Sequence, residues 1–131
     1  MRLFHGVNVV YKLPPYYPPI TDRFDSNSSL SDIDLQNLQK WGFNFIRLFA
    51  NWAAVEPVRG QYNYTYINVL KGIINRCQRY GIYVLLDAHQ DVAHARYCGE
   101  GFPDWAAVAN PDPSHFTRFP FPLPIKVPID P

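Results

Sequence analysis

The chain has 131 residues, a length typical of one domain, and its 47% hydrophobic and 18% charged residues argue against wholesale disorder. Its net charge of +1, from 12 basic and 11 acidic residues spread along the chain, supplies no basic stripe to neutralise phosphates and so excludes nucleic acid as an expected partner. No apolar run approaches the roughly 20 residues that span a bilayer, and residues 1–6 are too short for a signal peptide, so we expect a soluble chain without an export signal.

The first predicted elements are a strand and a helix separated by prolines. Residues 6–11 are rich in β-branched side chains, which predicts a strand. The four prolines of residues 13–19 exclude regular structure there. Ser31 lies three residues before Asp34 in a weak capping box, which predicts a helix over residues 32–41.

A second strand and helix and a third strand follow. Residues 43–49 are apolar except at Asn44 and Arg47, which predicts a strand buried on both faces. A helix is predicted next from apolar residues that recur on one stripe, namely Ile67, Leu70, Ile74 and Cys77. Gly81 ends this helix, and residues 82–87 predict the third strand.

The two helix-to-strand joints resemble each other. Residues 41–46 and 80–85, offset by 39 residues, each begin with an aromatic residue, continue with a glycine for a left-handed turn and enter an apolar strand. This repeat and the alternation of strands with helices predict an α/β fold, in which a parallel sheet carries helices on its outside.

Residues 89–131 depart from this regularity, with a glycine and aromatic cluster followed by a proline-rich stretch. Two interpretations stand: a disordered proline-rich tail, or a long loop over the mouth of a barrel. Three parallel strands with no continuation would leave an open edge and an uncovered inner face, so we do not expect the chain to fold stably alone.

The two cysteines support no metal site. Cys77 and Cys98 could form one disulfide if the protein is exported, but their spacing fits no pattern of metal ligands. For Cys77, which lies inside a predicted helix, a buried thiol is favoured.

Polar residues gather where the three predicted strands end, which is the face that carries the active site in a parallel barrel. Lys12 ends the first strand and is also explained by simple solvation. Arg47, near the end of the second, must meet a carboxylate to be tolerated among apolar neighbours. Asp87 is the one acid of the three strands placed to face it, and a partner elsewhere is the alternative. His89 could be a structural histidine or bind a ligand.

Four acids near this rim are candidate catalytic carboxylates by residue type alone: Asp87, Asp91, Glu100 and Asp104. A retaining glycosidase needs two carboxylates roughly 5 to 5.5 Å apart. Asp87 and Asp91 come from one strand and its adjoining loop, whereas opposed carboxylates on a barrel come from strands across the mouth. We therefore expect neither to be the nucleophile or the acid/base. No phosphate-binding glycine loop, serine nucleophile elbow or zinc-helix motif is present in the sequence.

Three segments together resemble endoglycoceramidases and related glycosylceramidases of glycoside hydrolase family 5. They are residues 6–12, residues 41–48 and, most specifically, His89-Gln90-Asp91-Val92 with the following residues 98–106. The resemblance runs in order from about residue 3 to 125. It implies that residues 1–131 form the N-terminal part of a catalytic domain: the first three βα units of a (β/α)₈ barrel, with a long proline-rich loop after the third strand.

The resemblance also implies roles for four residues. Lys12, His89 and Asp91 would hydrogen-bond hydroxyls of the sugar at the cleavage site, and Arg47 would support the nucleophilic carboxylate. Matches at Asn51 and Trp52 are less firm, and no role is assigned to them. No metal or organic cofactor is expected, since two carboxylates suffice for this chemistry.

By the family pattern, the acid/base glutamate ends strand four and the nucleophile ends strand seven, so we expect neither in this chain and no hydrolysis by it alone. A noncatalytic sugar- or lipid-binding remnant and a nonfunctional fragment of an incomplete gene model are the alternatives. The resemblance implies a monomer of the secretory pathway or extracellular space that acts on a glycosphingolipid or another β-glucoside and makes peripheral contact with membrane lipid. It does not decide whether the whole glycan or a single glucose is released, or whether the lipid is a ceramide or a sterol.

Overall fold

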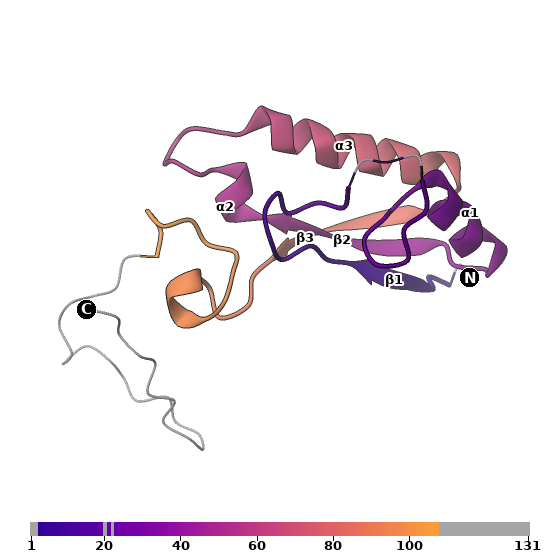
Figure 1. Ribbon diagram of the computed structural model, residues 1–131, viewed down its shortest axis with the longest axis horizontal. Coiled ribbons are helices and arrows are strands. Elements are labelled where there is room, and N and C mark those ends of the chain that lie inside the picture. The colour runs from indigo at the N-terminus through magenta and orange to yellow at the C-terminus, as the bar shows by residue number, and fades with distance from the viewer. Residues whose placement is uncertain (1–2, 20, 22, 108–131) are drawn as a thin grey trace, which may run out of the picture.

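The computed structural model describes residues 3–19, 21 and 23–107 (Figure 1). The proline-rich stretch predicted at the end of the chain lies outside these residues. The described helices and strands, in chain order, are β1 (Gly6–Val9), α1 (Asp32–Lys40), β2 (Phe45–Asn51), α2 (Trp52–Val55), α3 (Tyr64–Arg79), β3 (Tyr83–His89) and the 3₁₀ helix η1 (Ala95–Tyr97).

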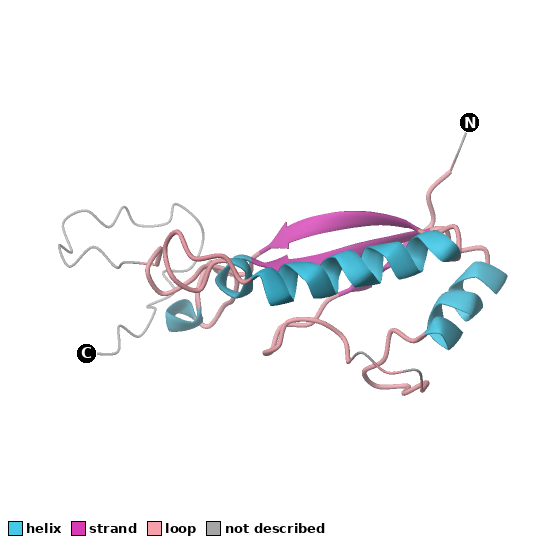
Figure 2. Cartoon of the chain, turned by 90° about the horizontal axis from the view of Figure 1, so that it is seen from above, coloured by secondary structure: helices cyan, strands magenta, loops and turns pink. Residues whose placement is uncertain are grey.

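The three strands form one parallel sheet in the order β1-β2-β3, as the alternation of strands and helices predicted. In this register Ile46 lies opposite Val7 on one side and Val84 on the other. Parallel neighbours need crossover connections, which α1 and α3 supply. Figure 2 shows α3 lying along the sheet, with α1 at the end nearest the N-terminus.

The two faces of β2 have different neighbours. Ile46, Leu48 and Ala50 alternate along the strand and pack into the core between sheet and helices. Buried residues of α1, α3 and the adjoining loops complete this core: Leu30, Leu35, Tyr66, Leu70, Ile73, Cys77 and Ile82. The intervening residues of β2 therefore point to the other face, away from this core.

The helix ends match the sequence signals. Ser31 caps α1 in a full capping box, because its hydroxyl accepts from the Asp34 N–H while the Asp34 carboxylate accepts from the Ser31 N–H. Gly42 and Gly81 both have positive φ, at 82° and 67°, so each makes the left-handed turn that leads directly into a strand.

Several boundaries differ from the predictions. α1 ends one residue early, at Lys40, and β2 and β3 begin at Phe45 and Tyr83 rather than at residues 43 and 82. β1 ends at Val9 rather than residue 11, and the Tyr11 hydroxyl instead donates to the Ser28 carbonyl. β2 and β3 each continue two residues further than expected, to Asn51 and His89, because their ladder extends that far. The short helix α2 was not predicted.

The described sheet has apolar residues of β3 open to solvent on both faces, since Leu85 and Leu86 are each about half exposed. Among the described residues, no helix is both long and apolar enough to cross a membrane.

Candidate functional site

The candidate site lies at the carboxyl ends of the three strands, on the face that carries the active site in parallel barrels. Figure 1 shows α2 and the loop after β3 at this end of the sheet, away from the N-terminus. Lys12 comes from the loop after β1, Arg47 from β2, and Asp87 and His89 from β3. These side chains form two connected clusters of charge.

The first cluster joins β2 to β3. Phe49 lies opposite Asp87 in the ladder, and Arg47 precedes Phe49 by two residues. Because side chains alternate along a strand, Arg47 and Asp87 point to the same face of the sheet. Arg47 Nη2 lies 2.8 Å from Asp87 Oδ2, and His89 Nδ1 lies 2.6 Å from the same oxygen. The prediction that Arg47 meets a carboxylate is confirmed, and the carboxylate is Asp87.

These contacts place a proton on His89 Nδ1. A 2.6 Å approach to a carboxylate oxygen requires that Nδ1 carry the proton and donate it to Asp87. Arg47 Nη2, which lies 3.3 Å from the same ring nitrogen, then has no acceptor there and is held by Asp87 instead. Nε2 is the remaining ring nitrogen. It is buried without a hydrogen-bond partner and lies 3.5 Å from Asp91 Oδ2.

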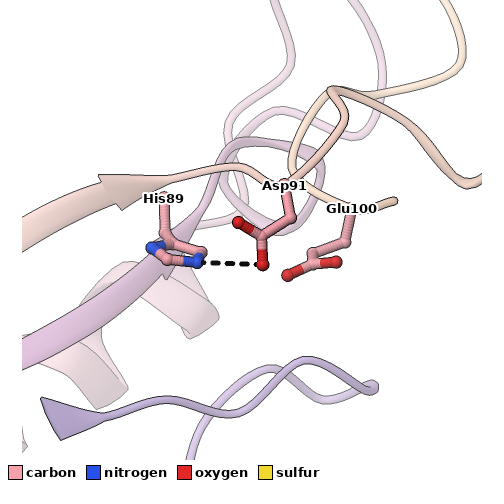
Figure 3. A group of neighbouring side chains, drawn as sticks. All are labelled: His89, Asp91 and Glu100. Carbon is pink, nitrogen blue, oxygen red and sulfur yellow. Dashed lines mark ion pairs between the residues drawn. The ribbon is translucent and has the colours of Figure 1, made fainter. Parts of the chain in front are cut away.

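The second cluster contains Lys12, Asp91 and Glu100. Lys12 Nζ forms an ion pair with Asp91 Oδ2 and lies 2.9 Å from Glu100 Oε1. Figure 3 shows the His89 ring pointing toward the Asp91 carboxylate, with Glu100 beside it. Asp91 therefore links the two clusters.

The loop after β3 is closed where Asp91 and Glu100 pair. Each N–H donates to the other's carbonyl, at 3.0 and 2.8 Å, in an isolated antiparallel bridge. A Cβ on Gly99 would overlap the Asp91 carbonyl, and Gly101 has φ of +126° with its missing Cβ directed at Gln90. Glycine is required at both places, so the two residues around Glu100 allow the loop to close on the strand end.

The ion pairs shift two pKa values in opposite directions. Hydrogen bonds from Lys12 to Asp91, and then to Glu100, raise the pKa of the Lys12 ammonium above its ordinary 10.5. The Lys12 hydrogen bond lowers the pKa of Asp91 below its ordinary 3.8. Both side chains are charged at neutral pH.

Three groups here could also bind a cation, because ligand atoms of His89, Asp91 and Glu100 all lie within 4.8 Å of one another. Lys12 already contacts both carboxylates and brings a positive charge to them. We therefore assign the compensating charge in this cluster to Lys12.

An aromatic wall borders the site. Trp52, which begins α2, stacks edge-on against Phe102 and Trp105 of the loop after β3, at centroid distances of 5.2 and 5.4 Å. The Trp105 indole donates to the Glu56 carbonyl. Asn51 has a structural role here, because its buried side chain caps α2 by accepting from the Ala54 N–H. The N-cap residue before a short apolar run was the sequence signal for α2.

A second histidine pair, between His94 and Asp104, stabilises the same loop. His94 is buried and caps η1, since its Nδ1 accepts from the Arg96 N–H. Its Nε2 must then donate to Asp104 Oδ1, 2.9 Å away. Asp104, one of the four candidate carboxylates, is thus a partner of His94.

The structure brings all four residues singled out from the sequence into this one site: Lys12, Arg47, His89 and Asp91. Their roles toward a substrate stay predictions. Sequence reasoning named Glu100 only as an acid by type and missed its contact with Lys12. The available sequence signal for this contact was the pair of glycines, Gly99 and Gly101, that lets the loop around Glu100 close tightly.

A parallel β/α sheet whose polar side chains gather at the carboxyl ends of its strands is the arrangement found in β/α barrel enzymes. The family described as Cellulase (glycosyl hydrolase family 5) matches residues 22–118, and the chain belongs to this family. The described sheet matches the N-terminal part of such barrels, which confirms the predicted first three βα units.

Individual relatives agree with the family. The chain is 46% identical to an endoglycoceramidase of Cyanea nozakii over 98% of its length and 42% identical to an endoglycoceramidase of Hydra vulgaris over 99%. It covers 24% of each of those proteins. The solved structure of endo-glycoceramidase II from Rhodococcus sp., in an iminocyclitol complex, superimposes with a TM-score of 0.65 at 26% identity, covering 82% of this chain and 25% of that one. The chain thus spans about a quarter of the length of the curated relatives it matches.

Proposed function

We propose that this chain supplies the first three βα units of a retaining glycoside hydrolase that cleaves the β-linkage between the glycan and the ceramide of glycosphingolipids. Family membership and the names of the relatives support the reaction class and the substrate class. The observation that carries the proposal is the convergence of Lys12, His89 and Asp91 at the rim, with His89 Nε2 buried and unpartnered.

In this proposal the three side chains bind hydroxyls of the sugar next to the scissile bond. Asp87 holds His89 Nδ1 and so directs Nε2, the other ring nitrogen, at the rim, where it forms a hydrogen bond with a hydroxyl. Asp91 also accepts, and Lys12 donates with the ammonium proton left after two contacts. Hydrogen bonds to sugar hydroxyls strengthen as the ring approaches the oxocarbenium-like transition state, and so they assist hydrolysis.

Arg47 holds the nucleophilic carboxylate in the same proposal. Its guanidinium has five N–H donors, of which Nη2 is directed at Asp87, so donors remain for a second carboxylate. A cation beside the nucleophile keeps it ionised and therefore reactive.

The nucleophile and the acid/base are glutamates of further strands in the full-length gene product, by the family pattern. Two such carboxylates carry out the reaction with retention of configuration, and the chemistry requires no metal or organic cofactor. Within the described rim, the acids Asp87, Asp91 and Glu100 are engaged with Lys12, Arg47 or His89.

We place the reaction at a lipid surface in the secretory pathway or outside the cell. Ceramide is held in a bilayer, so the mouth of the barrel must approach the headgroup region. Leu13 and Val92, on the loops after β1 and β3 at this mouth, are 76% and 63% exposed. These are the apolar side chains proposed to make peripheral contact with lipid.

The test is hydrolysis of defined glycolipids by the full-length gene product. We expect lactosylceramide to yield intact lactose and ceramide by mass spectrometry, and ¹H NMR to detect the β-anomer first. Release of glucose from glucosylceramide alone would instead assign single-glucose specificity. Failure to release sugar from either lipid would contradict the proposal.

A further inference from the structure

Glu100 occupies a position that the backbone is built to maintain. Its N–H and carbonyl both pair with Asp91, and the residues on either side, Gly99 and Gly101, permit approaches that a Cβ would block. The Glu100 side chain is only 17% exposed. Its carboxylate is therefore placed beside Asp91 by main-chain geometry rather than by the freedom of a surface side chain.

The charges around Glu100 do not balance. Lys12 supplies one positive charge, whereas Asp91 and Glu100 supply two negative charges, and Lys12 Nζ contacts both. One ammonium cannot saturate two carboxylates, since each carboxylate has several acceptor sites. The cluster therefore keeps strong acceptors for neutral hydroxyl groups.

From this geometry we infer that Glu100 is a positioning residue, which shares the Lys12 ammonium with Asp91 and thereby keeps Asp91 free to accept a substrate hydroxyl. This inference rests on the proposed function. Without the Glu100 charge, the Lys12 ammonium would pair with Asp91 alone and engage more of its acceptor sites, so fewer of them would be left for an incoming hydroxyl.

The test compares Glu100→Gln and Glu100→Asp in the full-length gene product, with lactose as the probe in calorimetric titrations. Glutamine keeps the size of the side chain and removes its charge, so we expect the Kd for lactose to rise about ten-fold, the effect of one lost hydrogen bond to a charged group. Aspartate keeps the charge, and we expect it to restore most of the affinity. Glu56→Gln is the matched control, because Glu56 accepts from Trp52 and Gly60 and not from Lys12.

A second measurement reports on Glu100 without any sugar. The ¹³Cε signal of Lys12, followed by NMR from pH 9 upward, should titrate at lower pH in Glu100→Gln than in the unmodified protein, because one of its two carboxylate partners is gone. Thermal melting shows whether each variant is folded.

The outcomes separate the two claims. If the unmodified protein binds lactose and Glu100→Gln binds it equally well, the inference is overturned and the proposed function stands. If the unmodified protein does not bind lactose, the inference is overturned whatever the Lys12 signal does, and hydrolysis of the two glycolipids decides the proposed function separately. Weakened binding in Glu100→Gln with an unchanged Lys12 titration would also overturn the inference, since the effect would not pass through Lys12.

Discussion

Asp87 is the residue on which the orientation of the site depends most. Its Oδ2 accepts from Arg47 Nη2 at 2.8 Å and from His89 Nδ1 at 2.6 Å. The His89 side chain is 13% exposed and that of Asp87 is 19% exposed, so water replaces this bond poorly when it is lost. Asp87→Ala would leave a buried imidazole N–H and a half-buried guanidinium without their acceptor.

The expected cost follows from these exposures. A hydrogen bond to a charged group contributes about 1.5–3 kcal/mol, and the well-buried His89 bond should approach that range. Arg47 is 38% exposed, so its ion pair is screened by solvent and adds at most about 1 kcal/mol. We therefore expect Asp87→Ala to lower the free energy of unfolding by about 3 kcal/mol and Asp87→Asn by about half as much, because the amide oxygen still accepts one N–H.

Urea unfolding of the full-length gene product measures this change, and long-range ¹H–¹⁵N NMR reports the His89 tautomer. The unmodified protein should show the proton on Nδ1, and Asp87→Ala should lose that preference. Asp104→Asn is the control, because Asp104 is 85% exposed and its amide could still accept the one N–H from His94. A change below about 0.5 kcal/mol in Asp87→Ala, or an unprotonated Nδ1 in the unmodified protein, would refute the reasoning.

Three further predictions concern the loop, the ion pair and the thiols. Gly99→Ala should open the bridge between Asp91 and Glu100, because the added methyl group would overlap the Asp91 carbonyl. Faster hydrogen exchange of the Glu100 amide would show this opening, and unchanged exchange would contradict it. The pKa of Asp91 is lower in the folded protein than its ordinary 3.8. The stability that Asp91 contributes is therefore fully present above pH 3.8 and is lost as the pH falls through the folded-state pKa. In Lys12→Met the Asp91 carboxyl carbon should titrate nearer 3.8 by NMR, and an unchanged titration would exclude Lys12 as the cause. Burial raises the pKa of Cys77 to about 11, whereas Cys98 is exposed, so a disulfide-exchange reagent at pH 8 should modify Cys98 quickly and Cys77 only on unfolding. Rapid reaction of both thiols would contradict this burial.

The order of elements could be predicted because local signals specify it. The capping box at Ser31 and the glycines at residues 42 and 81 mark the helix ends, and the apolar runs between them form strands as expected. The end of β3 was harder to predict, because Asp87 is polar and interrupts the apolar run. Asp87 and His89 both face the inner side of the sheet, where polar side chains serve the site, so the strand continues between them.

The candidate site was predictable in its members but not in its contacts. Arg47 needed an acid, and the sequence offered Asp87, yet the pairing depends on the register of β2 against β3. The contact of Glu100 with Lys12 depends on how the loop after β3 folds back on the strand end, which no local periodicity encodes. The disulfide considered from the sequence is absent, since Cys77 is buried in α3 and Cys98 is exposed, both as free thiols.

The most direct test of the central claim is a crystal structure of the full-length gene product with lactose bound. We predict that sugar hydroxyls lie within hydrogen-bond distance of His89 Nε2, an Asp91 oxygen and Lys12 Nζ at the carboxyl ends of the strands. Lactose bound elsewhere, with His89 Nε2 still unpartnered, would contradict the assignment of this rim as the sugar-binding site.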